Sequence, residues 1–150
     1  MQPNRIRPLA IGVFRHDSRI LVFEGCDPVT QQTFYRPPGG GIEFGEYGHQ
    51  ALAREIREEI GAEIDGVCYL GTLENIFTLN GRPGHEIVRV YAASFVAQAF
   101  YERPEFDGRE DDGSRFRCLW QPLAAFVTGQ ARLVPEELLA LLGQGAGHVA

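Results

Sequence analysis

The run Pro37-Pro38-Gly39-Gly40-Gly41 and the segment that follows it constrain the fold more than any other part of this chain. Proline lacks an amide donor and glycine lacks a Cβ, so the run suits neither a helix nor a regular strand, and we expect a loop. The next segment, Gly48–Ile60, predicts an amphipathic helix because apolar residues such as Leu52 and Ile56 recur every four positions. Gly61 is expected to end it in a left-handed C-cap.

Segments rich in β-prone residues, bounded by turn-forming residues, predict strands elsewhere in the chain. A proline in the first turn predicts one further helix near the C-terminus. In chain order we expect a hairpin of Arg7–Phe14 and Arg19–Glu24 around His16-Asp17-Ser18, a short strand Gln32–Arg36, a second hairpin of Val67–Leu79 and Glu86–Ala97 around a longer loop Asn80–Gly84, a surface loop Tyr101–Gly113, a last strand Arg115–Gln121, a helix Pro135–Leu142, and a frayed end Gly143–Ala150.

This order of elements predicts an α/β fold in which a mixed sheet is flanked by helices. The chain has 150 residues, 44% of them hydrophobic, which suits one compact domain spanning residues 1–150. No apolar stretch has the length of a signal sequence or a membrane span, so we expect a soluble, unexported, cytoplasmic protein.

Charge and cysteine content exclude several classes of function. The formal net charge of −6 disfavours long nucleic acid as a partner. A small anionic ligand remains compatible with this charge if metal ions neutralise the contact. Cys26, Cys68 and Cys118 are widely spaced and show no zinc-binding pattern, so we expect buried thiols in a reducing compartment.

Three glutamates lie on one side of the expected helix. On a helical wheel with Leu52 at 0°, Glu58, Glu55 and Glu59 fall at about 240°, 300° and 340°. Repulsion within this arc needs a positive partner, which Arg54 or a divalent cation with oxygen ligands could supply. A solvated acidic face is the simpler interpretation of the glutamates alone. The glycine-rich loop that leads into the helix favours the cation, because glycines let backbone groups approach a ligand.

The spacing of these residues resembles the Nudix box of the MutT-like Nudix hydrolases. The segment from Gly40 to Ala62 is GGIEFGEYGHQALAREIREEIGA. It matches the pattern Gly-x5-Glu-x7-Arg-Glu-U-x-Glu-Glu-x-Gly-U, where U is bulky and aliphatic, except that Ala62 is small. Tyr47 stands where a Thr or Ser cap is commoner. The matching positions are Gly40, Glu46, Arg54, Glu55, Glu58, Glu59 and Gly61.

The resemblance implies a Nudix-type α/β/α sandwich with its box at residues 40–62, and a role for each box residue. Arg54 would hold Glu55 or Glu46 by a charge-assisted hydrogen bond. Glu46 would orient a water molecule at the metal, or the loop itself. The implied ligands of Mg²⁺, for which Mn²⁺ could substitute, are the carbonyl of Gly39 and the carboxylates of Glu55, Glu58 and Glu59.

The general base and the substrate-binding residues are less closely defined. Glu55 is the first candidate for the base, and the acidic loop Glu110-Asp111-Asp112 is the second, with a solvated charge run as the alternative for that loop. Backbone or side-chain contacts to substrate are expected from a wider set. This set contains Tyr35, Arg36, Gly40 and Glu74, with Asn75, His85 and Glu86 as further polar residues near the second hairpin.

The implied activity is magnesium-dependent hydrolysis of the pyrophosphate bond in a nucleoside diphosphate linked to another moiety, as in nucleotide-pool housekeeping. Two alternatives stay open: a catalytically silent Nudix-fold nucleotide sensor, and a box whose cation only stabilises the helix. The subgroup is undetermined, because selectivity lies in loops outside the box. The expected partner is a small-molecule nucleotide, without long nucleic acid or membrane, and a homodimer is the commonest assembly for such a chain.

Overall fold

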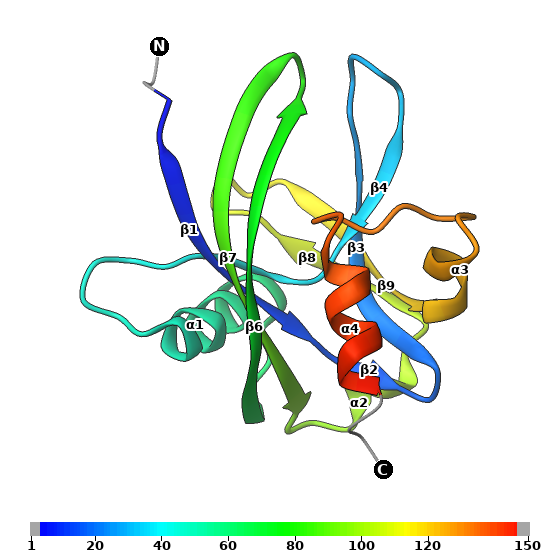
Figure 1. Cartoon of the computed structure of the whole chain (residues 1–150). Coiled ribbons are helices and arrows are strands. Elements are labelled where there is room, and N and C mark those ends of the chain that lie inside the picture. The colour runs from blue at the N-terminus through cyan, green and yellow to red at the C-terminus, as the bar shows by residue number, and fades with distance from the viewer. Residues whose placement is uncertain (1–3, 147–150) are drawn as a thin grey trace.

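The computed structural model describes residues 4–146, whose strands form two sheets (Figure 1). The first sheet has the strand order β5-β1-β7-β6 and is mixed, because β1 pairs parallel with β7 and antiparallel with β5. The second sheet is antiparallel, with the order β2-β3-β9-β8 and with β4 paired to β3. The strands are β1 (Ile6–Val13), β2 (Arg15–His16), β3 (Arg19–Cys26), β4 (Thr33–Arg36), β5 (Gly39–Gly41), β6 (Ile64–Leu79), β7 (Arg82–Phe95), β8 (Glu105–Arg109) and β9 (Arg115–Pro122).

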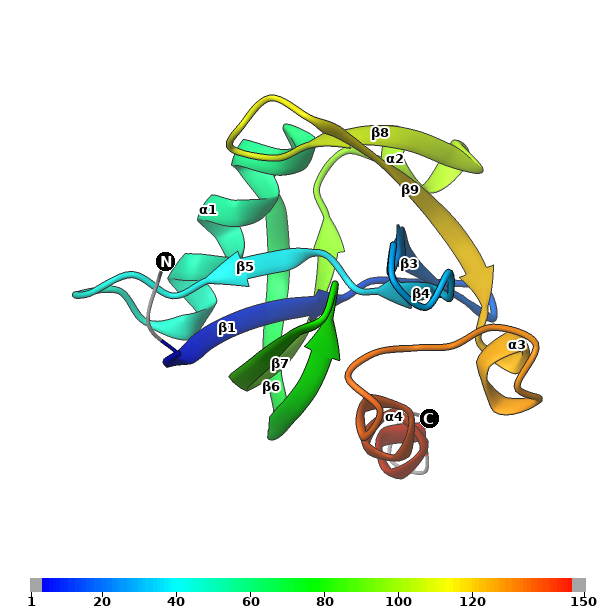
Figure 2. The ribbon, with the colours of Figure 1, turned by 90° about the horizontal axis from the view of Figure 1, so that it is seen from above.

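Helices cover both faces of the first sheet. Figure 2 shows α1 (Gly48–Ile60) and α4 (Leu138–Ala146) on opposite sides of β1, β6 and β7. Two short helices, α2 (Ala99–Glu102) and α3 (Leu123–Val127), lie at the ends of strands. None of the helices within residues 4–146 is long and apolar enough to cross a lipid bilayer. The expected α/β/α sandwich, a mixed sheet flanked by helices, is confirmed.

The alternation of side chains along β1 explains these layers. Leu9 and Ile11 belong to the core cluster that contains Leu138 of α4. Ala10, between them in sequence, belongs to the cluster that contains Leu52 of α1. Successive side chains of a strand point to opposite faces, so one central strand joins both halves of the core.

Helix α1 has the predicted bounds. Leu52 and Ile56 are fully buried, and Gly61 takes the left-handed conformation with φ of 76°. At the other end the amide of Tyr47 donates to Oε1 of Gln50 at 2.8 Å, which satisfies a backbone group without a Ser or Thr cap. The small Ala62 is only 2% exposed, so it still packs in the core.

The first predicted hairpin is wrong over most of its length. β1 and β3 belong to different sheets, and pairing across the turn is limited to Arg15 with Ile20 and His16 with Arg19. β1 is buried on both faces from Leu9 to Val13, as is typical of an interior strand with parallel pairing.

The second hairpin is present, but its loop is two residues long rather than five. Asn80 and Gly81 both have positive φ, 54° and 72°, the combination that a tight type I′ turn requires. The run Arg82–Gly84 therefore belongs to β7. Pro83 is tolerated there because β1 pairs with β7 only from His85 onwards, so within residues 4–146 no strand needs an amide of Pro83 on that side.

The predicted loop at Pro37–Gly41 is also partly wrong, because Gly39–Gly41 forms the edge strand β5. Glycine is needed for this close pairing: Gly39 has φ of 149°, and a Cβ there would lie 2.1 Å from the carbonyl oxygen of Ala10.

Several other expectations need correction. The predicted surface loop Tyr101–Gly113 contains the end of α2 and all of β8, and the predicted helix at Pro135 begins at Leu138. α4 runs through Gly143 to Ala146 without fraying there, and residues 147–150 lie outside the described part of the chain. Cys118 is buried as expected, whereas Cys26 and Cys68 are exposed. Cys26 is the last residue of β3, and Cys68 lies in the exposed first part of β6.

Candidate active site

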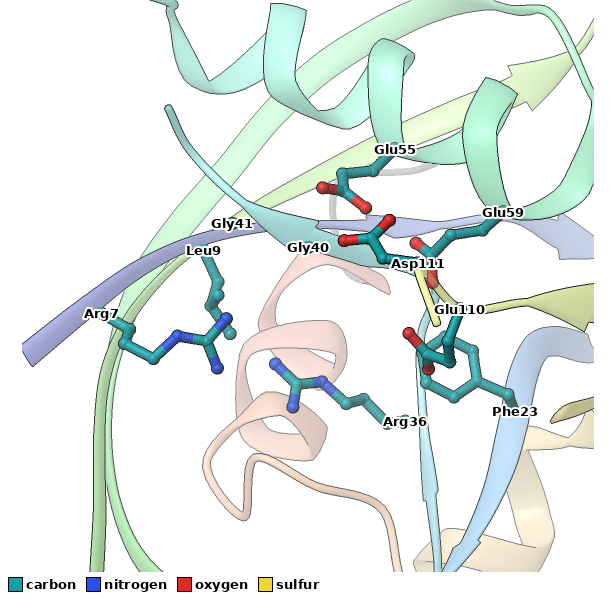
Figure 3. A pocket seen from close by; sticks show the side chains of 11 residues that line it. Arg7, Leu9, Phe23, Arg36, Gly40, Gly41, Glu55, Glu59, Glu110 and Asp111 are labelled. Atoms are coloured by element: carbon teal, nitrogen blue, oxygen red, sulfur yellow. The ribbon is translucent and has the colours of Figure 1, made fainter. Parts of the chain in front are cut away.

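A cavity of about 260 Å³ lies where β5, α1 and the β8–β9 loop meet (Figure 3). Its walls come from segments far apart in sequence, and β1, β3 and β4 supply the remaining side. The lining residues are Arg7, Leu9, Phe23, Arg36, Gly39, Gly40, Gly41, Glu55, Glu59, Glu110 and Asp111.

Charges of opposite sign are separated across this cavity. Glu55 and Glu59 approach from α1, and Glu110 and Asp111 approach from the β8–β9 loop. The guanidinium of Arg36, together with that of Arg7, enters from the opposite side (Figure 3). The arrangement can therefore hold cations against the acidic wall and an anion against the arginines.

Glu59 has the most unusual environment among the acids. It is 7% exposed, and its Oε1 has no hydrogen-bond partner among the residues that the structure describes. Burial, together with the nearby Glu55, Glu110 and Asp111, raises the pKa of Glu59 to about 9. A buried, unpaired carboxylate is costly unless a proton or a cation neutralises it. The oxygen-rich surroundings fit a hard divalent cation such as Mg²⁺.

Arg54 ties the box together. Its Nη2 donates to Oε1 of Glu46 at 2.6 Å, and its Nε donates to Oε2 of the same carboxylate at 3.1 Å. Nη1 donates to Oε1 of Glu55 at 2.9 Å, and Nη2 also donates to the carbonyl oxygen of Gly41 at 2.8 Å. Arg54 thus contacts both partners that the sequence suggested, and it joins the loop after β5 to α1.

Glu46 holds the loop itself. Its Oε1 accepts from the backbone amide of Glu43 at 2.9 Å. The hydrogen bonds from Arg54, followed by that amide, hold the pKa of Glu46 below its usual range. Of the two roles expected for Glu46, these contacts support the orientation of the loop.

The three box glutamates do not form a preassembled set of ligands. Glu58 has a side chain that is 48% exposed, contacts Nη1 of Arg54 at 3.3 Å and does not line the cavity. Within residues 4–146, no three acidic, histidine or cysteine side chains converge as a metal site. Arg54 instead pairs with carboxylate oxygens of both Glu55 and Glu58, at 2.9 Å and 3.3 Å.

The acidic loop before β9 divides into two parts. Glu110 and Asp111 line the cavity, and burial followed by the charges of Asp111 and Asp112 raises the pKa of Glu110. Asp112 instead accepts from the amide of Ser114 at 2.8 Å and stabilises the turn. This loop is therefore more than a solvated charge run.

Gly40 permits the close approach of the loop to α1. A Cβ at this position would lie 2.5 Å from Cδ of Glu55. The carboxylate of Glu55 therefore rests directly against the backbone of β5, beside Gly39 in the same cavity wall.

The expected substrate-binding residues separate in the structure. Arg36 and Gly40 line the cavity. Tyr35 points to the other face of β4, where its hydroxyl donates to Oε2 of Glu24 at 3.1 Å and its ring packs near Phe126. Glu74 lines a different cavity, together with Asn75, Ile76, Glu136 and Glu137.

Sequence reasoning missed Arg7, Leu9 and Phe23 as cavity residues. Arg7 lies two residues before Leu9, so both share one face of β1. Arg7 is a charged residue on the strand face that also carries Leu9 and Ile11, and this was the available indication that the face opens into a polar site. Phe23 pairs with Arg36 across β3 and β4, a long-range register that no local pattern predicts.

A layered α/β/α fold with a cavity of clustered acids opposite arginines defines a domain that can bind an anion through cations. The family model of the NUDIX domain matches residues 4–142. The chain therefore belongs to the Nudix hydrolase family, whose members act on acid anhydrides and generally use divalent metal ions.

Solved structures support this assignment at the level of the fold. A NUDIX hydrolase from Nitrosomonas europaea superposes with a TM-score of 0.67 at 20% identity, covering 95% of this chain and 90% of that one. A MutT NUDIX hydrolase from Burkholderia pseudomallei gives a TM-score of 0.58 at 25% identity, covering 81% and 86%.

One curated relative shares local sequence similarity. The NAD-capped RNA hydrolase NudC of Vibrio atlanticus (strain LGP32) is 34% identical over 68 residues, which is 45% of this chain. The match spans only 24% of the length of that relative.

Proposed function

We propose that residues 1–150 form one Nudix hydrolase domain that uses Mg²⁺ to hydrolyse the pyrophosphate bond of a nucleoside diphosphate linked to another moiety. The observation that carries this proposal is the buried Oε1 of Glu59, which lacks a partner among the described residues. It lies in a cavity that already holds three other carboxylates. A proton can neutralise Glu59 itself, and the entry of cations would balance the cluster of four carboxylates as a whole.

The proposed ligands of Mg²⁺ are Glu55, Glu58, Glu59 and the carbonyl of Gly39, with Mn²⁺ as a substitute. Glu58 would join the others by leaving Arg54, which it now contacts. When bound, the cations would neutralise phosphate charge and favour attack by water on phosphorus.

The protein side chains supply positioning and proton transfer. Arg54 and Glu46 hold Glu55 and the loop after β5 in place. Glu55 is our first candidate for accepting the proton of the attacking water. Glu110 is the second, because its raised pKa brings its proton affinity closer to neutral pH. Arg7 and Arg36 would bind the phosphate that stays with the rest of the substrate.

The group linked to the nucleoside diphosphate has to be identified by assaying a panel of substrates. The local similarity to an NAD-capped RNA hydrolase supports including NAD-capped RNA and, as its small-molecule counterpart, NAD. Nucleoside triphosphates, dinucleoside polyphosphates and nucleotide sugars complete the panel. The net charge of −6 leads us to expect turnover of the small molecules rather than of RNA.

Hydrolysis of at least one panel member with Mg²⁺, followed by chromatography of the two phosphorylated products to locate the bond cut, tests the proposal. Glu55→Gln and Glu59→Gln should abolish it. The matched control is Glu63→Gln, because Glu63 is an exposed carboxylate paired with Arg57 beyond the end of α1. Tight nucleotide binding without turnover of any panel member would instead identify a sensor.

A further inference from the structure

Glu86 is a buried acid outside the cavity wall described above. It lies on β7, is 3% exposed and lines none of the cavities described here. Its Oε1 accepts from Nδ2 of Asn75 at 3.2 Å and from Nη2 of Arg36 at 3.5 Å. A buried carboxylate is retained at a considerable desolvation cost, so its contacts need an explanation.

These contacts connect the two sheets. Glu86 and Asn75 are direct partners on β7 and β6 of the first sheet, whereas Arg36 belongs to β4 of the second. The side chain of Arg36 is 24% exposed and that of Glu86 is 4% exposed. In this ion pair the carboxylate is therefore buried, whereas the guanidinium remains accessible to a ligand.

Arg36 lies where two cavities adjoin. It lines the acidic cavity, where its charge acts on Glu110. It also lines a second cavity of about 220 Å³. That cavity is formed by Asp27, Phe34, Arg36, Asn75, Ile76, Phe77, Thr78, Leu79, Arg132, Val134 and Glu136.

The second cavity differs in character from the first. Phe34 lies on the same face of β4 as Arg36, and Phe77 on the same face of β6 as Asn75. Each ring rests on a glycine of the neighbouring strand, Phe34 on Gly25 and Phe77 on Gly84. Two aromatic side chains with fixed positions suit a planar group attached to the diphosphate.

We propose that Glu86, with Asn75, is a positioning residue that aims Arg36 at the phosphate nearest the second cavity. A substrate would then span both cavities, with its diphosphate in the acidic one and its planar group between the aromatic side chains. This inference rests on the proposed function, but it concerns substrate affinity rather than the chemical step. Glu86 is too buried to touch substrate and acts only through Arg36.

A double-mutant cycle tests this coupling. We expect Glu86→Gln and Arg36→Gln each to raise KM about tenfold while kcat changes less than about twofold. The double variant should be no worse than Arg36→Gln alone, because Glu86 has no role once its partner is lost. Asn75→Ala should raise KM in the same direction by a smaller factor, and it keeps the carboxylate if Glu86→Gln folds poorly.

The matched control is Glu24→Gln. Glu24 contacts Arg117 at the same 3.5 Å, but its side chain is 34% exposed and it lines neither of the two cavities. Its loss should leave KM unchanged. The melting temperature of every variant separates a loss of stability from a loss of affinity, and Glu86→Asp should restore KM in part.

Binding of ADP with Mg²⁺, measured by calorimetry, gives a readout that does not need turnover. The same non-additive loss of affinity is expected in Glu86→Gln and Arg36→Gln, so the inference stays testable even if hydrolysis of the panel fails. Additive effects, or a fall in kcat or melting temperature with KM and ADP affinity unchanged, would overturn it.

Discussion

Arg54 is the residue on which most of the local geometry depends. It donates to Glu46, Glu55, Glu58 and the carbonyl of Gly41. A planar guanidinium can make these contacts simultaneously, whereas an ammonium group lacks the fixed fork. The side chains of Glu46 and Glu55 are only 17% and 15% exposed, so these two contacts matter more than an exposed ion pair such as that with Glu58.

Arg54→Lys is therefore expected to lower kcat about ten- to a hundredfold, because Glu46 and Glu55 would lose their common support. Steady-state kinetics on the best substrate measure this effect. Arg57→Lys provides the control, since Arg57 lies on the same helix but pairs only with the exposed Glu63. Equal losses in both variants would contradict the role that we assign to Arg54.

The three thiols should differ in reactivity. Burial above all raises the pKa of Cys118 to about 12, whereas Cys26 and Cys68 are exposed. Thiolate is the reactive form, so a disulfide reagent should label two thiols rapidly in the folded protein and the third only after denaturation. Rapid labelling of all three thiols under native conditions would show that Cys118 is accessible.

The residue pattern of the box predicted which side chains contact one another, but it did not predict which of them are buried. Glu55, Glu58 and Glu59 shared one arc of the helical wheel, yet only Glu55 and Glu59 line the cavity. Local periodicity cannot predict which part of the arc the β8–β9 loop will cover. The same limit explains the exposed Cys26 and Cys68, since cysteine composition alone does not reveal which face of a strand is buried.

At the scale of elements, the accuracy of the sequence analysis follows the range of the interactions. α1 and its end at Gly61 were predicted correctly because apolar spacing and capping are local. β5 was not, because Gly39–Gly41 becomes a strand only by pairing with β1, which lies 28 to 32 residues earlier. The Asn80-Gly81 turn was assigned too long because Arg82–Gly84 joins its strand through long-range pairing.

The contact between β5 and α1 gives a prediction about glycine. Gly40→Ala would place a Cβ 2.5 Å from Cδ of Glu55, so the carboxylate must move and kcat should fall at least about tenfold. The melting temperature should change little, because the displaced group is a side chain.

Gly41→Ala is the matched comparison. A Cβ there would meet only Nη2 of Arg7, at an ordinary 3.9 Å, so the loss of kcat should be clearly smaller. If the two substitutions reduced kcat equally, the packing of Glu55 against Gly40 would not explain the effect.

At the scale of the whole molecule, the fold brings together residues from both sheets and from α1. Glu59, Arg36 and Glu110 lie far apart in sequence, so no short motif contains the cavity. The Nudix box predicted the acidic wall of the cavity. The arginine side depends on the register of β1 and β4, which only the folded chain defines.

Cation binding should therefore stabilise the fold as well as permit activity. We expect Mg²⁺ to raise the melting temperature of the wild-type protein, and EDTA to reverse the shift and abolish hydrolysis. Glu59→Gln should melt at a similar or higher temperature without metal, since it replaces a buried carboxyl group whose ionisation is costly with a neutral amide, and it should respond less to Mg²⁺. A full Mg²⁺ shift in Glu59→Gln would place the cations elsewhere.

Pro83 has a consequence for the solution behaviour of the molecule. Within residues 4–146, β1 pairs with β7 only from His85, so the first three residues of β7 have no strand partner on that side. Such an edge could template pairing with a strand of another molecule. A proline has no amide hydrogen to offer such a strand. Pro83 thus protects this hairpin against edge-to-edge aggregation, at a position where the described part of the sheet gives β7 no second strand partner.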